Sequence, residues 1–455
     1  RIWKIQCGSY GSHAWKWNRG LYPGIPPADE DHISTGIREY SAVACSVVHD
    51  IYRLHLPQLY KKKCIFPGGF EKGGKQKPDD EGTRIFYRGE GRQKEMKKIC
   101  FFSGDITRSG GTERVAAMIA NGLQQTGRYE IVFLSLVEKN KDTFFPLDSA
   151  VSRYALGEKW ISPGPGYLKL LPKIRRFIRQ QNIDIIVDID IVLDILSIPA
   201  CRGMKVKIVS WDHFNFDFEM SVFYRRMILK YSVKHTDVVI TLTKENEEAY
   251  RRQLGRTENI TTIYNPMEKI KEIPDDSGRE KYVITAGRLV EEKGTDYLAV
   301  VAAKVLEKYP DWKWLVLGEG EMRHLLEETI KEKHLEGRLV LTGNVQDVGA
   351  YLAKSQIFVL TSRREGLPMC LLEAKAYGLA CISFDIRTGP KEIIRDGRNG
   401  YLIPPFDCDR MAEKTGWLIE QEEVRNTFCH RAKEGTEEFE FAKIIEKWER
   451  EVLTE

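Results

Sequence analysis

The sequence predicts an α/β protein with two doubly wound domains that face each other across a cleft. From residue 96 onward, short apolar runs alternate with longer stretches of helical periodicity, which is the pattern of βα units in a parallel sheet. The pattern occurs twice, and a polar segment from Pro266 to Arg279 separates the two series. Because such sheets bind ligands beyond the carboxyl ends of their strands, we expect a ligand between the two domains.

The composition excludes several classes of protein. The chain has 455 residues, 42% hydrophobic and 30% charged, which is typical of a soluble globular protein of two or three domains. No uncharged apolar run reaches the ~20 residues of a membrane-spanning helix, since four aspartates interrupt the most apolar stretch, Ile183–Ala200. The 70 basic and 66 acidic residues leave a net charge of +4, which is too small to predict a nucleic-acid partner.

The nine cysteines indicate a reducing compartment, and we expect a cytoplasmic protein. Their number is odd, and none forms a CxxC or Cys/His pair with the spacing of metal ligands. Cys100, Cys370 and Cys381 lie in apolar runs, where Cys is usually a small buried side chain. The sequence therefore predicts neither a disulfide framework nor a cysteine metal site.

Residues 1–95 differ from the rest of the chain. They lack a clear hydrophobic period, contain Gly/Pro clusters at Tyr22–Pro27 and Pro67–Gly74, and end in the polar run Gly82–Glu95. Two interpretations stay open. The segment is either a folded accessory region, or an extension that is disordered or not native, with Met96 as the natural start.

The first α/β series predicts a Rossmann-like domain over residues 96–270. Its expected helices lie near Thr112–Gln125, Tyr167–Gln181, Glu219–Lys234 and Lys244–Gln253. Its expected strands are Lys98–Ser103, Ile131–Leu136, Ile183–Asp188, Lys207–Trp211, Val238–Thr241 and Asn259–Ile263.

A linker over residues 271–281, containing Pro274 and Gly278, leads to a second Rossmann-like domain over residues 282–430. A helical tail, Ala432–Leu453, closes the chain within residues 431–455. The expected helices lie near Thr295–Tyr309, Glu321–Glu332, Pro368–Tyr377 and Pro390–Arg395. The expected strands are Tyr282–Ala286, Trp312–Leu317, Arg338–Thr342, Ile357–Thr361, Ala380–Ser383 and Gly400–Ile403.

Gly110 and Gly111 follow the first strand and open a helix. Glycines there let backbone N–H groups approach an anion, and the helix N-terminus adds partial positive charge. An ordinary turn has the same composition, and no Walker or GxGxxG pattern accompanies it. The motif indicates an anion site only in combination with others.

Arg288 and Lys293 follow the strand Tyr282–Ala286, five residues apart. At the carboxyl end of a strand, a guanidinium fork and an ammonium point charge suit a diphosphate. The alternative is a solvated basic turn, since Glu291 and Glu292 lie between them.

Glu365 and Glu373 flank the start of a predicted helix, eight residues apart, which separates them by about 12 Å. That distance is too long for an acid/base pair on one bond, but it suits two hydroxyl-bearing ends of one long ligand. We expect the backbone N–H groups of residues 366–369, which include Gly366 and Leu367, to bind a phosphate that lies between the two carboxylates. The alternative for Glu373, an ordinary surface Glu, fits poorly with its apolar neighbours.

His213 follows the strand Lys207–Trp211 at its carboxyl end, where the cleft is expected. A neutral imidazole there can exchange a hydrogen bond with a sugar hydroxyl. A structural histidine is the alternative.

Two basic and apolar stretches, near residues 167–181 and 223–234, match helices that lie on anionic lipid surfaces. The alternative, an apolar stripe on the core with a solvated basic face, explains the same periodicity.

Together these motifs resemble the family-4 retaining glycosyltransferases of GT-B fold, over Met96 to about Arg450. The E-x7-E element of that family stands as Glu365…Glu373, and its Gly-Arg-Leu…Lys-Gly element as Gly287–Leu289 with Lys293 and Gly294. The run Phe384–Ile394 is similar to the bacterial capsule and exopolysaccharide branch, which includes amylovoran-type transferases. Residues 1–95 have no counterpart in this family.

The resemblance implies a role for each candidate residue. Arg288 and Lys293 would hold the donor diphosphate, Glu373 the ribose, and Glu365 with Gly366 and Leu367 the donor sugar. Asn344 and Val345 would meet the base, His213 the sugar, and Gly110 and Gly111 the phosphates from the acceptor domain. The tail would cross back onto that first domain.

The resemblance further implies a hexose or N-acetylhexosamine transfer from a UDP-sugar to a lipid-linked or saccharide acceptor, with no metal and no cofactor. The sequence Asp188-Ile189-Asp190 lies in an apolar run and does not match a metal-binding Asp-x-Asp. Two alternatives stay open: a nucleotide-sugar epimerase of the same fold, and a non-catalytic protein that binds sugar nucleotides.

Overall fold

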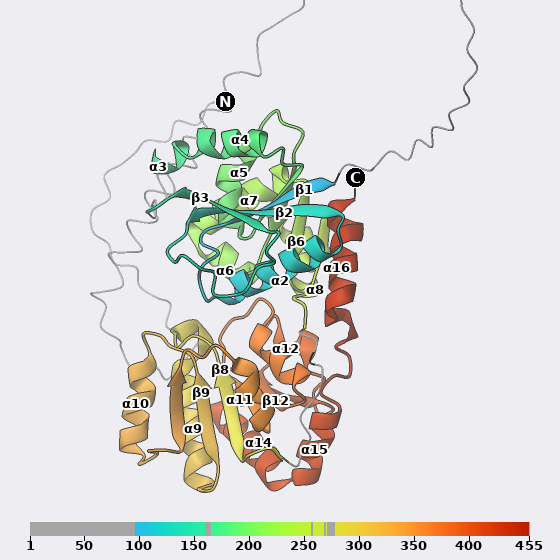
Figure 1. Ribbon diagram of the computed structural model, residues 1–455. Helices are drawn as coiled ribbons and strands as arrows, with labels where there is room; N and C mark the ends of the chain where they lie inside the picture. The colour runs from blue at the N-terminus through green and yellow to red at the C-terminus, as the bar shows by residue number, and fades with distance from the viewer. Residues whose placement is uncertain (1–95, 160–164, 256–257, 268–269, 271–277, 455) are drawn as a thin grey trace, which may run out of the picture.

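The computed structural model describes residues 96–454 except 160–164, 256–257, 268–269 and 271–277, and its two halves stand one above the other (Figure 1). Each half is a parallel sheet flanked by helices. The two alternatives for residues 1–95, and the prediction for most of the linker 271–281, fall outside the described residues.

The sheet of the first half has seven strands in the order β3-β2-β1-β4-β5-β6-β7. Its elements are β1 Lys97–Ser103, α2 Gly111–Gln125, β2 Tyr129–Val137, β3 Ser152–Gly157, α3 Pro165–Leu168, α4 Leu171–Gln180, β4 Ile185–Asp188, a 3₁₀ turn Ile191–Leu193, α5 Asp194–Cys201, β5 Lys207–Trp211, α6 Phe216–Ser221, α7 Phe223–His235, β6 Val238–Thr241, α8 Lys244–Leu254 and β7 Ile260–Thr262.

The second half has six strands in the order β10-β9-β8-β11-β12-β13. Because both sheets place their first strand beside the fourth, each is doubly wound, and the predicted fold class is confirmed. Its elements are β8 Tyr282–Ala286, a 3₁₀ turn Glu291–Lys293, α9 Thr295–Lys308, β9 Lys313–Leu317, α10 Arg323–Glu332, β10 Leu339–Gly343, α11 Val348–Lys354, β11 Ile357–Leu360, α12 Met369–Ala376, β12 Ala380–Phe384, α13 Pro390–Ile393, β13 Gly400–Ile403, α14 Cys408–Glu420 and α15 Glu422–His430.

The apolar runs form strands that are buried on both faces. Phe101 in β1 lies opposite Phe133 in β2 and Val187 in β4, and all three are fully buried. Helices cover both faces of such a sheet, so its strands are continuously apolar, and the sequence located them well.

One edge strand of the first sheet, β3, was not predicted. The strand β3 pairs in parallel with β2, but most of its side chains are exposed or half-buried, so it has no apolar run. The helix α5 was also missed, because seven of its eight residues are buried, so it lacks the amphipathic period of a surface helix. Asp190 accepts the N–H of Val192 at the 3₁₀ turn, and Asp194 accepts the hydroxyl of Ser210 at 2.6 Å inside the core.

Two predicted helices, Tyr167–Gln181 and Glu219–Lys234, are each divided in two, while the basic stretch 223–234 lies within the single helix α7. The stretch Tyr167–Gln181 divides into α3 and α4, with Pro172 in the first turn of α4. The stretch Glu219–Lys234 divides into α6 and α7 at Val222, which has extended backbone angles. In α4 the buried side chains are Ile174 and Ile178, so its apolar stripe lies on the core.

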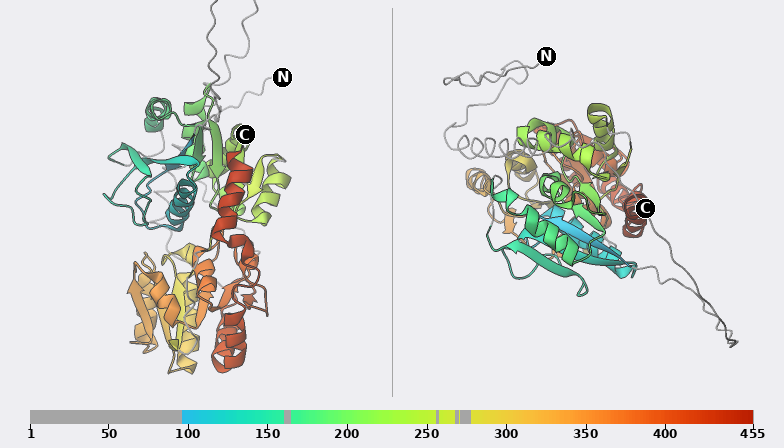
Figure 2. Two further views of the ribbon diagram at one scale, coloured as in Figure 1. Left: turned by 45° about the vertical axis from the view of Figure 1, so that its right-hand side comes forward. Right: turned by 90° about the horizontal axis from the view of Figure 1, so that it is seen from above.

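The C-terminal tail differs from the single helix that was predicted. A 3₁₀ turn, Glu437–Phe439, precedes α16, Phe441–Trp448, and a π-helical turn, Glu449–Leu453. This segment runs alongside the first half (Figure 2), where Trp448 packs on Trp211 with ring centroids 4.8 Å apart. The prediction also missed α11, α14 and α15 in the second half.

Candidate active site

A cavity of about 1330 Å³ lies between the carboxyl ends of the two sheets. The loops after β1 and β5 line it from the first half, and those after β8, β10 and β11 line it from the second. All of the site residues predicted from the sequence line this cavity: Gly110, Gly111, His213, Arg288, Lys293, Asn344, Val345, Glu365, Gly366, Leu367 and Glu373.

Lys293 and Glu365 are bound to each other in the cavity wall. The Nζ of Lys293 lies 2.8 Å from both carboxylate oxygens of Glu365, and the Ser362 hydroxyl donates to Oε1 at 2.6 Å. Burial lowers the pKa of Lys293, but the neighbouring carboxylate outweighs it, and the net pKa is raised. The cavity wall therefore carries a charged Lys293 ammonium group that is paired with the Glu365 carboxylate.

Gly294 allows the loop after β8 to reach this position. Its φ is +65°, and a Cβ there would lie 2.1 Å from the main-chain oxygen of Thr361. Only glycine adopts this conformation at so close an approach without strain. The contact brings Lys293 beside the turn that carries Glu365.

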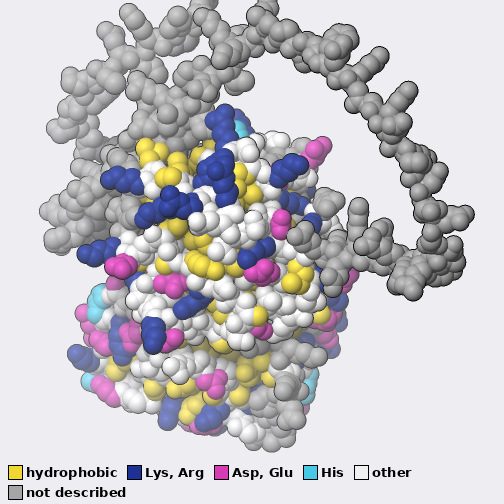
Figure 3. Space-filling model, turned by 45° about the horizontal axis from the view of Figure 1, so that its top comes forward, with side chains coloured by type: hydrophobic (Ala, Val, Ile, Leu, Met, Phe, Trp, Pro, Cys, Tyr) yellow, Lys and Arg dark blue, Asp and Glu magenta, His cyan; other side chains and the backbone are white. Residues whose placement is uncertain are grey.

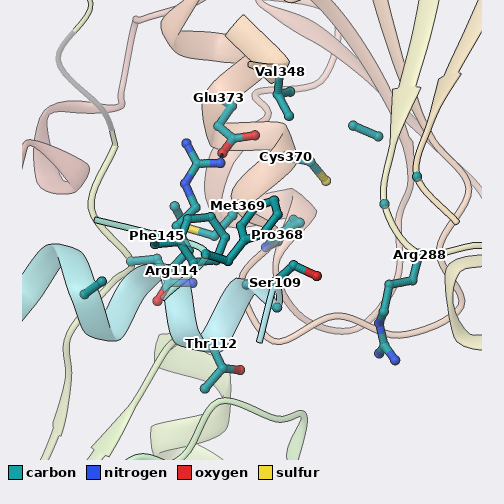
Figure 4. Close-up of a pocket in the computed structure, with 18 of the residues that line it drawn as sticks. Ser109, Thr112, Arg114, Phe145, Arg288, Val348, Pro368, Met369, Cys370 and Glu373 are labelled. Atoms are coloured by element: carbon teal, nitrogen blue, oxygen red, sulfur yellow. Dashed lines mark ion pairs between the residues drawn. The ribbon is translucent and has the colours of Figure 1, made fainter. Parts of the chain in front are cut away.

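In the close-up of the cavity, the Arg288 side chain lies well to one side of Arg114 and Glu373 (Figure 4). Its side chain is exposed, and it forms no ion pair with the part of the chain that the structure describes. An accessible guanidinium in a cleft retains all its donors for an anionic ligand.

Glu373 in α12 forms an ion pair with Arg114 in α2, and the two side chains point toward one another across the cleft (Figure 4). The carboxyl side chain is nearly buried, and the Arg114 guanidinium also lies 5.9 Å from the ring centroid of Phe145. Sequence analysis did not single out Arg114. Its position in the first turn after the glycine pair was the signal that could have identified it.

Gly110 and Gly111 begin α2 and line the cavity as expected. A Cβ on Gly111 would meet nothing within 4 Å, whereas one on Gly110 would lie 2.2 Å from the carboxylate of Glu113. Burial raises the pKa of Glu113, and Arg108 and Arg288 oppose that rise. The approach of a phosphate to these glycines stays a prediction.

His213 lies in the loop between β5 and α6. Burial lowers its pKa to about 3, so the imidazole is neutral at pH 7. Its ring centroid lies 4.4 Å from that of Trp211, and Nε2 is buried without a hydrogen-bond partner among the described residues. The neighbouring Asp212 accepts the N–H of Phe214 at 2.9 Å and the hydroxyl of Tyr250 at 2.7 Å, which holds the loop in place.

Asn344 and Val345 line the cavity between β10 and α11. Gln346, Asp347 and Val348 continue this wall, and the carboxylate of Asp347 accepts the N–H of Ala350 at the start of α11. These residues form the part of the cavity wall that follows β10 in the second half.

Asp188 lies in the core of the first half. Its carboxylate accepts the hydroxyl of Ser197, and burial together with the neighbouring Asp194 raises its pKa. Among the residues with described positions, no cluster of three or more His, Cys, Asp or Glu side chains is arranged to hold a metal ion.

Two family models match the chain. That of the glycosyl transferases group 1 matches residues 266–435, and that of glycosyltransferase family 4 matches residues 109–268. The two matches divide the chain close to the boundary between the two sheets.

Three curated relatives match this chain over nearly their whole lengths. An uncharacterized glycosyltransferase of Haemophilus influenzae is 30% identical over 353 residues, covering 78% of this chain and 99% of the relative. The amylovoran biosynthesis glycosyltransferase AmsD of Erwinia amylovora is 27% identical, covering 78% and 99%. A Campylobacter jejuni α-1,4-N-acetyl-D-galactosaminyltransferase, named for a diNAcBac-PP-undecaprenol-linked saccharide, is 26% identical, covering 78% and 97%.

Solved structures share the fold. Anabaena HepE in complex with UDP and glucose is 18% identical, with a TM-score of 0.64 over 76% of this chain and 97% of that one. A Staphylococcus aureus TarM mutant in complex with fondaparinux, α-GlcNAc-glycerol and UDP is 25% identical, with a TM-score of 0.54 over 61% and 58%.

Proposed function

Because the chain belongs to the group 1, family 4 glycosyltransferases of GT-B fold, we propose that it moves a hexose or N-acetylhexosamine from a UDP-sugar to a lipid-linked or saccharide acceptor. The proposed pathway is the synthesis of a surface polysaccharide. The observation that carries the proposal is that Arg288, Lys293, Glu365 and Glu373 line one cavity between the two sheets.

The proposal gives the donor one orientation in this cavity. Arg288 and Lys293 take the diphosphate, and Glu373 takes the ribose hydroxyls, with the base toward Asn344 and Val345. Glu365 with the N–H groups of Gly366 and Leu367, and His213 from the other half, take the sugar. The UDP in the TarM complex supports a uridine nucleotide.

The proposed reaction retains the anomeric configuration. As the bond between C1 and the diphosphate oxygen breaks, negative charge builds on the leaving group, and Arg288 and Lys293 stabilise it without a metal. Glu365 is held by Lys293 and Ser362, so it serves as a binding group rather than a nucleophile. The acceptor attacks from the leaving-group face, and the departing phosphate takes its proton.

In this proposal the acceptor binds the first half of the chain. The Campylobacter relative is named for an undecaprenol-linked saccharide, and the Erwinia relative for exopolysaccharide synthesis, which supports an acceptor of this class. None of the described helices is long and apolar enough to cross a bilayer. We propose peripheral binding at the cytoplasmic membrane face.

Basic side chains support the membrane contact. Lys and Arg side chains gather among hydrophobic ones over the end of the first half that carries α3 and α4 (Figure 3). In α4 these cations are solvent-exposed at Lys173, Arg176 and Arg179, and α7 begins at the exposed Phe223. Such a surface suits an anionic leaflet.

A panel of UDP-, GDP- and dTDP-sugars tests the function. At least one UDP-sugar should raise the melting temperature, undergo slow hydrolysis, and transfer its sugar to an undecaprenyl-diphosphate saccharide. Release of a free epimer without acceptor would identify an epimerase instead. Binding without any turnover would identify a non-catalytic protein.

A further inference from the structure

We propose that Thr388 positions the donor sugar. Its hydroxyl group links, by hydrogen bonds, two segments from opposite halves of the molecule that are both proposed to contact the sugar. The first is the His213 loop, residues 212–217 between β5 and α6. The second is the Glu365 turn, residues 365–368 before α12. The inference rests on the proposed function, because the ligand whose position it sets is the donor sugar.

The hydroxyl of Thr388 forms two hydrogen bonds in opposite directions. The Asn215 amide Nδ2 donates to Thr388 Oγ1 at 2.6 Å, and that hydroxyl donates to the main-chain oxygen of Glu365 at 2.6 Å. An amide nitrogen only donates and a carbonyl oxygen only accepts, so both directions are settled. Thr388 is 1% exposed and Asn215 7%, so water does not compete for these bonds.

Asn215 is firmly attached to the first half. Its Oδ1 accepts the N–H of Asp217 at 2.8 Å where α6 begins, which also fixes the orientation of its amide. The side chain of Asn246 donates to the main-chain oxygen of Phe214 at 2.9 Å. A shift of Asn215 would therefore also move His213, which lies two residues away in the same loop.

The two segments also meet directly. A Cβ on Gly366 would lie 2.4 Å from the main-chain oxygen of His213, so the turn and the loop are in contact. Gly389 follows Thr388 with a φ of +97°, and a Cβ there would lie 2.7 Å from Pro368. The two segments are therefore packed closely, and the hydrogen bonds of Thr388 set their relative position. We expect the loss of these two hydrogen bonds, the Thr388 bridge, to shift His213 relative to Glu365.

Ion pairs anchor Thr388 itself to the first half. Arg387 binds Asp217 and lies 3.1 Å from Glu245, and Lys391 lies 2.8 Å from Glu245. The two hydrogen bonds of Thr388 reach neither Arg288 nor Glu373, which the proposal assigns to the diphosphate and the ribose. Removing the Thr388 hydroxyl should therefore weaken the binding of the sugar part of the donor and leave the binding of the nucleotide part unchanged.

The experiment compares Thr388→Val with Thr388→Ser in the full chain. Thr285→Val is the matched control, because Thr285 also donates to a carbonyl (Val359, 2.9 Å) and accepts an indole N–H (Trp314, 3.1 Å), both within the second sheet. Calorimetry measures the Kd of UDP, UDP-glucose and UDP-N-acetylglucosamine for each protein.

We expect Thr388→Val to weaken the binding of the preferred UDP-sugar about tenfold while the Kd of UDP changes less than about twofold. Thr388→Ser, which keeps the hydroxyl, should bind the UDP-sugar like the wild type. Thr285→Val should leave the Kd of both UDP and the UDP-sugar unchanged. Equal loss of UDP and UDP-sugar, or no loss of either, would overturn the inference.

Hydrogen exchange separates this inference from the proposed function. Failure of the wild-type chain to bind any of the three nucleotides would contradict the proposed function alone. The bridge is then judged on its own. Thr388→Val should speed amide exchange in both residues 212–217 and residues 365–367, and Thr285→Val in neither. Unchanged exchange in either segment would refute the bridge.

Discussion

Arg114 of α2 and Glu373 of α12 form an ion pair that spans the cleft between the two sheets. Their side chains are 23% and 7% exposed, so the pair is largely shielded from water. One partner is a residue that the sequence motif identified, and the other comes from the opposite half of the molecule. The carboxylate proposed to bind the ribose is thus paired with a cation that only the fold brings to it.

Replacing Arg114 with Ala should weaken UDP binding about tenfold, because it leaves a nearly buried carboxylate without its counterion. Arg114→Lys should restore part of the affinity. Arg128→Ala, which removes a more exposed ion pair with Glu449 beyond the end of α2, is the control and should bind UDP normally. Calorimetry measures the affinities. Tighter UDP binding in Arg114→Ala would show that Arg114 competes with the ribose instead.

Arg288→Ala and Lys293→Ala should each lower kcat by on the order of 10²-fold or more, because each removes a cation aimed at the leaving diphosphate. Lys281→Ala is the control, since Lys281 precedes the opposite end of β8 in an exposed ion pair with Asp311. Turnover is measured by release of UDP. Near-normal rates in both cleft variants would remove the proposed role from this pair.

Gly366→Ala should lower turnover by on the order of 10²-fold, because the added methyl group collides with the His213 carbonyl and shifts the sugar site. Gly111→Ala adds the same group where nothing lies within 4 Å, so its melting temperature should equal that of the wild type. Its donor affinity should still fall if a phosphate approaches this glycine. Wild-type turnover in Gly366→Ala would contradict the tight contact between the two halves.

His213 should make the fold less stable in acid. Its pKa is about 6.5 when unfolded and about 3 when buried, so the unfolded chain binds the extra proton first. The stability from the neutral imidazole is fully present above pH 6.5 and is lost as pH falls toward 3, by up to about 1.4 kcal/mol per pH unit.

His213→Asn should therefore show a shallower decline of melting temperature between pH 6.5 and pH 4 than the wild type. His324→Asn is the control, because His324 is exposed on α10 and its replacement should leave the decline unchanged. Parallel curves for His213→Asn and the wild type would show that the buried imidazole does not titrate in this way.

The strands that the sequence located are those that helices cover on both faces. The expected bounds of β5, β6, β8 and β13 match the structure at both ends. The edge strand β3 was missed because its exposed and half-buried side chains give no apolar run. The helix α5 was missed because seven of its eight residues are buried, so it lacks the amphipathic period of a surface helix.

The sequence by itself determined the two sheets and the candidate residues that follow their strands, because burial imposes a local hydrophobic pattern and parallel strands end at a common edge. Only the tertiary structure decided which of those residues touch: Lys293 with Glu365, Glu373 with Arg114, and Asn215 with Thr388. These pairs join segments that are distant in the chain, two of them across the cleft. The geometry of these pairs depends on how distant segments pack together, and a local hydrophobic pattern in the sequence carries no information about that packing.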